Sequence, residues 1–275
     1  MRDGWNRILG VALGLGTVFR LQVVPALNWR FRRVVGDVFA NRTMVRVASL
    51  VRPLLRTPIF VGIAGSAGKT TTKELLMGML SGAREGVANP ASFNDVSSVA
   101  KTILTARRGD DFCVVELSED KPGAMDEPMT LLRPEVGIVT VIGDDHVGAF
   151  ASREAIAAEV GKLVAGLPAH GVAVLNADDP LVLSMSERCA GRVITYGVSA
   201  RAELRAENVR SQWPERLGFT LVRGDERHEV HTQLCGAHWL AAALGAIGGG
   251  LAMGLTLSEC ARGLAGVPPF EGRMQ

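Results

Sequence analysis

Residues 59–72 have the sequence IFVGIAGSAGKTTT, and this short segment sets the class of fold. The first six residues are apolar, which predicts a short buried strand at 59–64. A glycine-rich loop follows, and the pattern from Lys73 to Leu80 predicts a helix. Strand, glycine loop and helix in this order form the context that a phosphate-binding P-loop requires.

The chemistry of phosphate binding explains this order. Glycines let successive backbone N–H groups surround phosphate oxygens, and the helix N-terminus adds partial positive charge. We expect Lys69 to reach the β- and γ-phosphates and the Thr70 hydroxyl to bind Mg²⁺. The residues predicted to bind the nucleotide here are Gly65, Ser66, Ala67, Gly68, Lys69, Thr70 and Thr71. Ile63 stands where the commonest P-loop has glycine, which points away from a generic nucleotide triphosphatase.

Polar residues follow two later apolar segments. Residues 112–117 predict a buried strand that ends on Glu116, and residues 135–142 predict another that leads to Asp144, Asp145 and His146. A magnesium–nucleotide site needs such groups at neighbouring strand ends. We therefore expect Glu116 and His146 to join Thr70 in holding Mg²⁺. The alternative for Glu116 is a cap on a strand in solvent.

Alternating strands and helices predict an α/β fold with a doubly wound, mostly parallel sheet. Residues 201–234 change to an Arg- and Glu-rich alternation, which predicts a small antiparallel patch at the rim. Residues 236–266 are rich in Ala, Gly and Leu with a helical period. Because this segment contains His238, Glu259 and Arg262, core packing is favoured over membrane insertion.

Composition excludes several classes of protein. The 275 residues are 47% hydrophobic and 21% charged, enough for a sizeable core and unlike a disordered tail or a collagen repeat. The four cysteines are widely spaced and form no C-x-x-C pair. This usage favours reduced thiols in a cytoplasmic protein over a disulfide scaffold or a zinc site.

Charge divides the chain into two parts. Residues 1–56 contain ten arginines, no lysine and two acidic residues, a net of +8, whereas residues 57–275 have a net of −6. The apolar run 8–19 is too short to cross a bilayer as a helix, which needs roughly 20 residues. The pattern in 29–56 predicts an Arg-rich helical extension of one or two amphipathic helices. We place the domain boundary between 56 and 57, where Pro53 and Pro58 bracket the junction.

Two interpretations of this extension stay open. Its basic face could lie on anionic lipid at the inner face of the membrane. Alternatively, its arginines are solvated and its helices pack on the domain that follows. Nucleic acid is not an expected partner.

Taken together, residues 57–275 resemble the central ATP-binding domain of the Mur ligase family. The matching segments, in the family's order, are the P-loop through Glu74, the loop Ser92–Asp95, Glu116 through Gly123, Arg133 through His146, Leu175–Asp179, Gly236–His238 and Pro269–Arg273.

The resemblance implies an ATP-dependent ligase that joins a carboxylate to an amine through an acyl phosphate, in peptidoglycan precursor synthesis. A UDP-linked muramyl peptide would be the acid, and an amino acid or dipeptide the amine. The resemblance further implies catalytic roles for Lys69, Glu116 and His146 and a substrate contact for Asn94. The nucleotide contacts that it adds are Asn176, Asp178 and Arg273.

Four departures from the family pattern accompany the resemblance. The family's opening domain is not recognisable in residues 1–56, and the sequence stops at Gln275, where a third domain would start; we expect a fragment without that domain. Val160 stands where the family has a metal-supporting lysine, and Lys162 lies roughly 200° further round the helix. Trp239 stands where family members often have an adenine-reading Asn. A membrane-associated ATP-binding module without ligase activity is therefore the alternative function.

Overall fold

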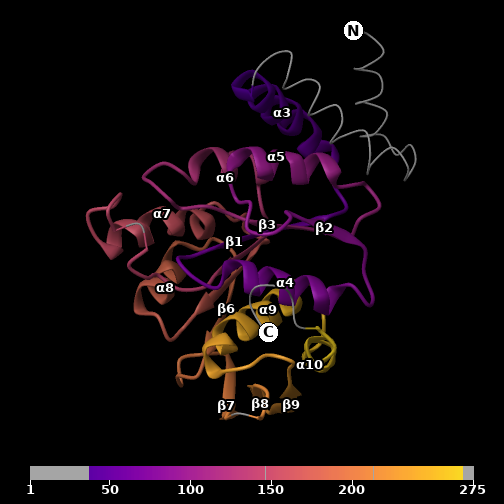
Figure 1. Cartoon of the computed structure of the whole chain (residues 1–275), viewed down its shortest axis with the longest axis vertical. Coiled ribbons are helices and arrows are strands. Elements are labelled where there is room, and N and C mark those ends of the chain that lie inside the picture. The colour runs from indigo at the N-terminus through magenta and orange to yellow at the C-terminus, as the bar shows by residue number, and fades with distance from the viewer. Residues whose placement is uncertain (1–36, 146, 213, 269–275) are drawn as a thin grey trace.

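Nine strands form a single sheet in the residues that this computed structural model describes, which are 37–145, 147–212 and 214–268. Their order across the sheet is β2-β3-β1-β4-β5-β6-β7-β8-β9 (Figure 1). The strands are β1 Ile59–Ala64, β2 Gly86–Ala88, β3 Phe112–Glu116, β4 Val136–Val139, β5 Val172–Asn176, β6 Arg192–Gly197, β7 Leu204–Arg210, β8 Gly218–Arg223 and β9 Glu226–His231. Pairing is parallel from β2 through β7 and antiparallel from β7 to β9. The predicted α/β class is confirmed, including the antiparallel patch within 201–234.

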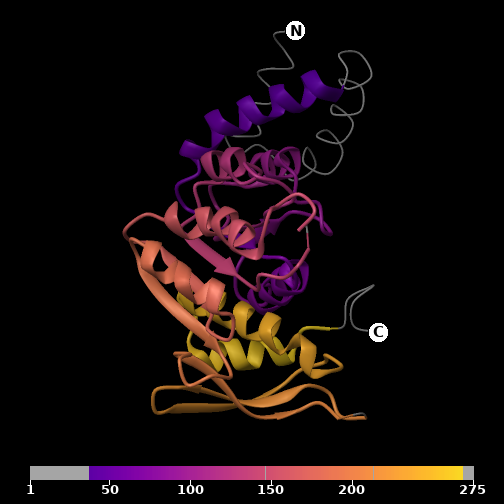
Figure 2. The same ribbon diagram turned by 90° about the vertical axis from the view of Figure 1, so that its left-hand side faces the viewer.

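Helices cover both faces of the parallel strands (Figures 1 and 2). One face packs against α4 Lys69–Leu80, α9 Leu240–Ala252 and α10 Leu257–Ala265. The other packs against α5 Val96–Thr105, α6 Asp126–Leu132, α7 Arg153–Ala165 and α8 Pro180–Ser184. Strand periodicity explains the two cores: in β1, Val61 and Ile63 enter the first, and Phe60 and Ala64 the second.

The glycines of α9 let this helix lie directly on the sheet. A Cβ at Gly248 would come within 2.5 Å of Val174, and one at Gly249 within 2.7 Å of Ile138. Both glycines are therefore needed for the close approach of helix and sheet. The core-packing interpretation of this apolar segment is correct.

Helix α3 Asp37–Val51 precedes the sheet and packs on α5. Ala48 and Val51 are buried against the α5 core, and Arg42 and Arg46 are exposed. The described part of the Arg-rich extension is thus helical and packs as the second interpretation predicts. The apolar run 8–19 lies outside the described residues. Among the described helices, none is long and apolar enough to span a membrane.

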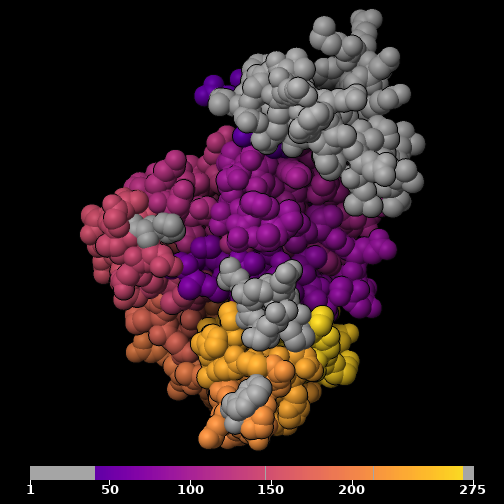
Figure 3. Space-filling model, in the orientation of Figure 1, coloured from indigo at the N-terminus to yellow at the C-terminus, as the bar shows by residue number. Residues whose placement is uncertain are grey.

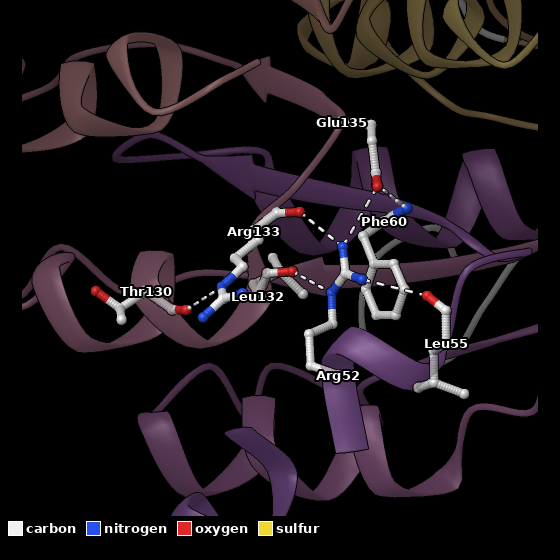
Figure 4. A network of polar contacts seen from close by, with 7 residues as sticks. All are labelled: Arg52, Leu55, Phe60, Thr130, Leu132, Arg133 and Glu135. Carbon is white, nitrogen blue, oxygen red and sulfur yellow. Dashed lines mark hydrogen bonds and ion pairs between the residues drawn. The ribbon is translucent and has the colours of Figure 1, made fainter. Parts of the chain in front are cut away.

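Arg52, in the 3₁₀ turn Arg52–Leu54, is buried at the amino ends of β1 and β4 (Figure 4). Its guanidinium donates to the carbonyl oxygens of Leu132 at 2.6 Å, Arg133 at 2.8 Å and Leu55 at 3.3 Å. It also lies 3.4 Å from the Glu135 carboxylate and 3.4 Å from the centre of the Phe60 ring. Burial lowers the pKa of Arg52, and Glu135 counters part of that effect. This arginine anchors the extension to the sheet.

Candidate nucleotide-binding site

The P-loop joins β1 to α4 at the carboxyl edge of the parallel strands. Gly65 and Gly68 have φ values of +125° and +82°, in the left-handed region where only glycine is unstrained. A Cβ at Gly65 would lie 2.3 Å from Thr140 Oγ1. The loop therefore has no room for a side chain at Gly65, and both glycines are needed for its shape.

The end of β4 holds the P-loop in place. Thr140 Oγ1 donates to the Ala67 carbonyl at 2.6 Å, and the Ser66 N–H donates to the Val141 carbonyl at 2.8 Å. Tyr196 on β6 donates its hydroxyl to the Val139 carbonyl at 3.0 Å. Burial raises the pKa of Tyr196, so its hydroxyl stays protonated as a donor. Thr140 and Tyr196 were not predicted, because each acts through a residue distant in sequence.

Lys69 bonds to two acceptors within the protein. Its Nζ donates to the Gly65 carbonyl at 2.5 Å and to Glu119 Oε1 at 2.8 Å. The side chain of Lys69 is 12% exposed, and that of Glu119 is fully buried. Sequence reasoning missed Glu119, although its place three residues after Glu116 was a usable signal. Glu119 therefore pairs with the same ammonium group that a bound phosphate would need.

Glu116 brings three predicted residues together. Its Oε2 accepts from the Thr70 hydroxyl at 2.8 Å, and its Oε1 accepts from the Asn94 amide at 3.2 Å. The Glu116 residue is 2% exposed, so the interpretation as a cap in solvent is wrong. A carboxylate and a hydroxyl are hard oxygen ligands, the type that Mg²⁺ prefers.

Two hydroxyls of the P-loop fit a phosphate. Ser66 Oγ and Thr71 Oγ1 are buried and have no hydrogen-bond partner among the described residues. A buried hydroxyl without a partner costs free energy, so such groups call for an explanation. An anion seated in the loop would supply the missing acceptors. The residues present therefore fit a nucleotide phosphate with its magnesium.

Other predicted site residues are placed differently. His146 and Arg273 lie outside the described residues. Asn176 Oδ1 accepts from the Asp178 N–H at 3.0 Å, and the Asp178 carboxylate accepts from the N–H groups of Val198 and Ser199. These two side chains thus shape the turns after β5 and β6, and their contact with nucleotide stays a prediction. No group of three or more His, Cys, Asp or Glu suited to a metal occurs within the described ranges.

The two substituted family positions also have clear surroundings. Val160 is fully buried in the core between sheet and α7. Lys162 Nζ lies 2.5 Å from Asp126 and 3.0 Å from Glu159, and the bond to Asp126 raises the pKa of Lys162. Lys162 is therefore held at the α6–α7 contact. Trp239 is half-buried on the α9 core, with its ring 4.5 Å from that of His238.

Comparison with known proteins gives a consistent result. A family model described as the Mur ligase middle domain matches residues 63–249. The UDP-N-acetylmuramoyl-tripeptide–D-alanyl-D-alanine ligase of Mycobacterium tuberculosis is 35% identical over 216 residues, which cover 78% of this chain and 42% of that protein. The Bacillus subtilis ligase of the same name is 29% identical over 207 residues, covering 75% and 44%.

Solved structures agree on the fold. MurF from Acinetobacter baumannii superposes with a TM-score of 0.79 at 23% identity, covering 85% of this chain and 51% of that one. MurF from Thermotoga maritima in complex with ADP gives 0.74 at 21% identity, covering 85% and 53%. The chain spans less than half the length of these curated relatives and about half of these structures.

Proposed function

The chain belongs to the Mur ligase family through its middle domain, and on that premise we propose that it is the ATP-binding part of a ligase joining a carboxylate to an amine. The observation that carries the proposal is the cluster at the carboxyl edge of the sheet. Thr70 and Asn94 both bond to the Glu116 carboxylate, beside a P-loop whose buried Ser66 and Thr71 hydroxyls have no hydrogen-bond partner in the part of the chain that the structure describes.

Each residue of the cluster has a proposed role toward ATP. Thr70 and Glu116 would hold Mg²⁺, with His146 as a further ligand, and Asn94 would contact substrate. Bound Mg²⁺ would neutralise charge that gathers on the phosphates. Lys69 would exchange Glu119 for the β- and γ-phosphates, while the loop's N–H groups surround them. Asn176, Asp178 and Arg273 would complete the nucleotide contacts.

The proposed reaction has two steps. ATP transfers its γ-phosphoryl group to the substrate carboxylate, releasing ADP and leaving an acyl phosphate. The amine then attacks the acyl carbon, and inorganic phosphate leaves as the amide forms. Both steps need the two substrates held in line, so residues beyond the middle domain would take part.

The names of the relatives suggest the substrates. We propose a UDP-linked muramyl peptide as the acid and a dipeptide such as D-alanyl-D-alanine as the amine, in cytoplasmic peptidoglycan precursor synthesis. The support is the 35% identity to a ligase named for these compounds.

A second candidate is a membrane-associated ATP-binding module without ligase activity. It is favoured by the outer side of α3, where Arg42 and Arg46 are exposed and Leu50 is 74% exposed. Co-sedimentation with anionic vesicles that is lost on deletion of residues 1–56, and weakened by salt, would support this candidate. Absent or salt-insensitive co-sedimentation would dismiss it.

Titration calorimetry with Mg-ATP tests the nucleotide site. The unsubstituted chain should bind, Lys69→Ala should lose at least roughly 100-fold in affinity, and Lys101→Ala on α5 should bind as the unsubstituted chain does. Circular dichroism checks that Lys69→Ala is folded, because the substitution takes the ammonium away from the buried Glu119 carboxylate. Failure of the unsubstituted chain to bind would overturn the proposed site.

A further inference from the structure

Lys73 is a buried cation that the proposed function does not use. It follows the three threonines of the P-loop on α4, and its side chain is fully buried. Lysine is almost never fully buried unless its ammonium is paired, because taking the charge out of water is costly. Its partners therefore indicate what this side chain does.

Those partners lie mainly in one loop. Lys73 Nζ donates to the carbonyl oxygens of Asn89, at 2.7 Å, and Ala91, and lies 3.2 Å from the Glu74 carboxylate. An ammonium has three donors, and two of them make the hydrogen bonds to Asn89 and Ala91, while the Glu74 carboxylate adds a close opposite charge. Two of the three go to the backbone of residues 89–95, which connect β2 to α5 and which we call the Asn94 loop.

The Asn94 loop has a conformation that needs support. Ala91 has a φ of +48°, in the left-handed region. For a residue with a Cβ this conformation costs roughly 1–2 kcal/mol, so surrounding contacts must hold it. The bond from Lys73 ends on the carbonyl of that same residue.

The Asn94 loop in turn holds Glu116 at two points and is braced by a bond of its own. Asn89 Oδ1 accepts from the Glu116 N–H at 2.9 Å, and Asn89 Nδ2 donates to the Phe93 carbonyl at 2.5 Å. Asn94 then donates to Glu116 Oε1. A continuous path of hydrogen bonds thus leads from the Lys73 ammonium to the carboxylate that also bonds to Thr70.

From this path we infer that Lys73 is a positioning residue: its buried ammonium fixes the Asn94 loop, and through Asn94 it orients the Glu116 carboxylate for magnesium. The inference rests on the proposed Mg-ATP site. Groups that orient metal ligands typically change metal affinity by 10–100-fold when they are removed. A purely structural lysine would change the stability of the fold without changing the magnesium dependence of nucleotide binding.

The test is a double-mutant cycle on Lys73→Met and Asn94→Ala in the whole chain, measured as ATP affinity with Mg²⁺ and with EDTA. Each single variant should weaken binding in Mg²⁺ by about tenfold and leave binding in EDTA unchanged. The double variant should bind ATP with about the affinity of the single variant that binds less tightly, because both substitutions act on one path. Lys101→Met is the matched control and should behave as the unsubstituted chain.

Two results would overturn the inference alone: magnesium-dependent binding by Lys73→Met equal to that of the unsubstituted chain, or losses that multiply to about 100-fold in the double variant. If Lys73→Met does not fold, Asn89→Ala replaces it, since it breaks the same path and keeps the ammonium. A loss through Asn89→Ala that is independent of Asn94→Ala would equally overturn it. Failure of the unsubstituted chain to bind Mg-ATP is a separate result and would remove the proposed function itself.

Discussion

The two ends of the parallel strands each hold a cation, but with different sets of polar groups around it. At the amino ends of β1 and β4, Arg52 has an acceptor for each of its nitrogens, and Glu135 also accepts from the Phe60 N–H at 2.7 Å. At the carboxyl ends, Lys69 is held by Glu119, near three hydroxyls, of Ser66, Thr71 and Thr72, that lack partners among the described residues. A saturated set of polar groups serves the fold, whereas an unsaturated set is where a ligand can contribute. We therefore expect substitutions at the amino end to change folding stability, and substitutions at the carboxyl end to change nucleotide binding.

Replacing Arg52 with methionine tests this separation at the amino end. The substitution leaves three carbonyl groups and Oε1 of Glu135 without the Arg52 donor, which should lower the free energy of unfolding by about 2–4 kcal/mol. Urea unfolding measures the loss, and Arg42→Met on exposed α3 should stay within about 0.5 kcal/mol of the unsubstituted chain. ATP affinity of folded Arg52→Met should not change. A stable Arg52→Met protein would show that the contacts of Figure 4 do not anchor the extension.

The substitution Thr71→Val should act in the opposite sense, at the carboxyl end. Because the lost hydroxyl has no hydrogen-bond partner within residues 37–145, 147–212 and 214–268, the free energy of unfolding should change by less than about 0.5 kcal/mol. ATP binding should weaken by about 1.5 kcal/mol, or roughly tenfold, through the lost bond to a charged phosphate. Calorimetry measures the affinity, with Thr105→Val on α5 as the matched control. Unchanged affinity would mean that the hydroxyl does not face a phosphate.

The smallest change is expected for Glu119→Gln. The carboxylate competes with phosphate for Lys69, so its neutralisation should tighten ATP binding by about 1 kcal/mol, roughly fivefold. The same variant should be less stable without nucleotide, because a buried ion pair is lost. Glu187→Gln, an exposed residue, should alter neither property. Weaker ATP binding in Glu119→Gln would instead make Glu119 a partner of the nucleotide complex.

Sequence reasoning predicted correctly which residues lie together where their position depends on local order. The P-loop follows from one strand, one loop and one helix, and Glu116 was found because it ends the neighbouring strand. Parallel strands place their carboxyl ends at one edge, so these residues had to meet. Asn94 was assigned through the family resemblance, and its bond to Glu116 agrees with a place in the site.

Residues that depend on long-range packing were not predictable. Arg52 looked like one of ten arginines in a basic segment, yet it is buried by groups about 80 positions away. The sequence analysis did not predict the burial of Lys73 or of Glu119. Periodicity cannot distinguish a solvated charge from a buried paired one, because the difference lies in the partner.

The amino-acid sequence alone determined the P-loop and the alternation of strands and helices. It also determined that Thr70 and Glu116 lie together, because that alternation brings both to the carboxyl edge of the sheet. These features follow from local geometry and from the period of apolar residues, which act before any distant contact forms. The folded chain added the ammonium positions of Lys69 and Lys73 and the anchoring of α3. Those depend on which carbonyls and carboxylates surround each buried charge, and only the packing of distant segments can supply them.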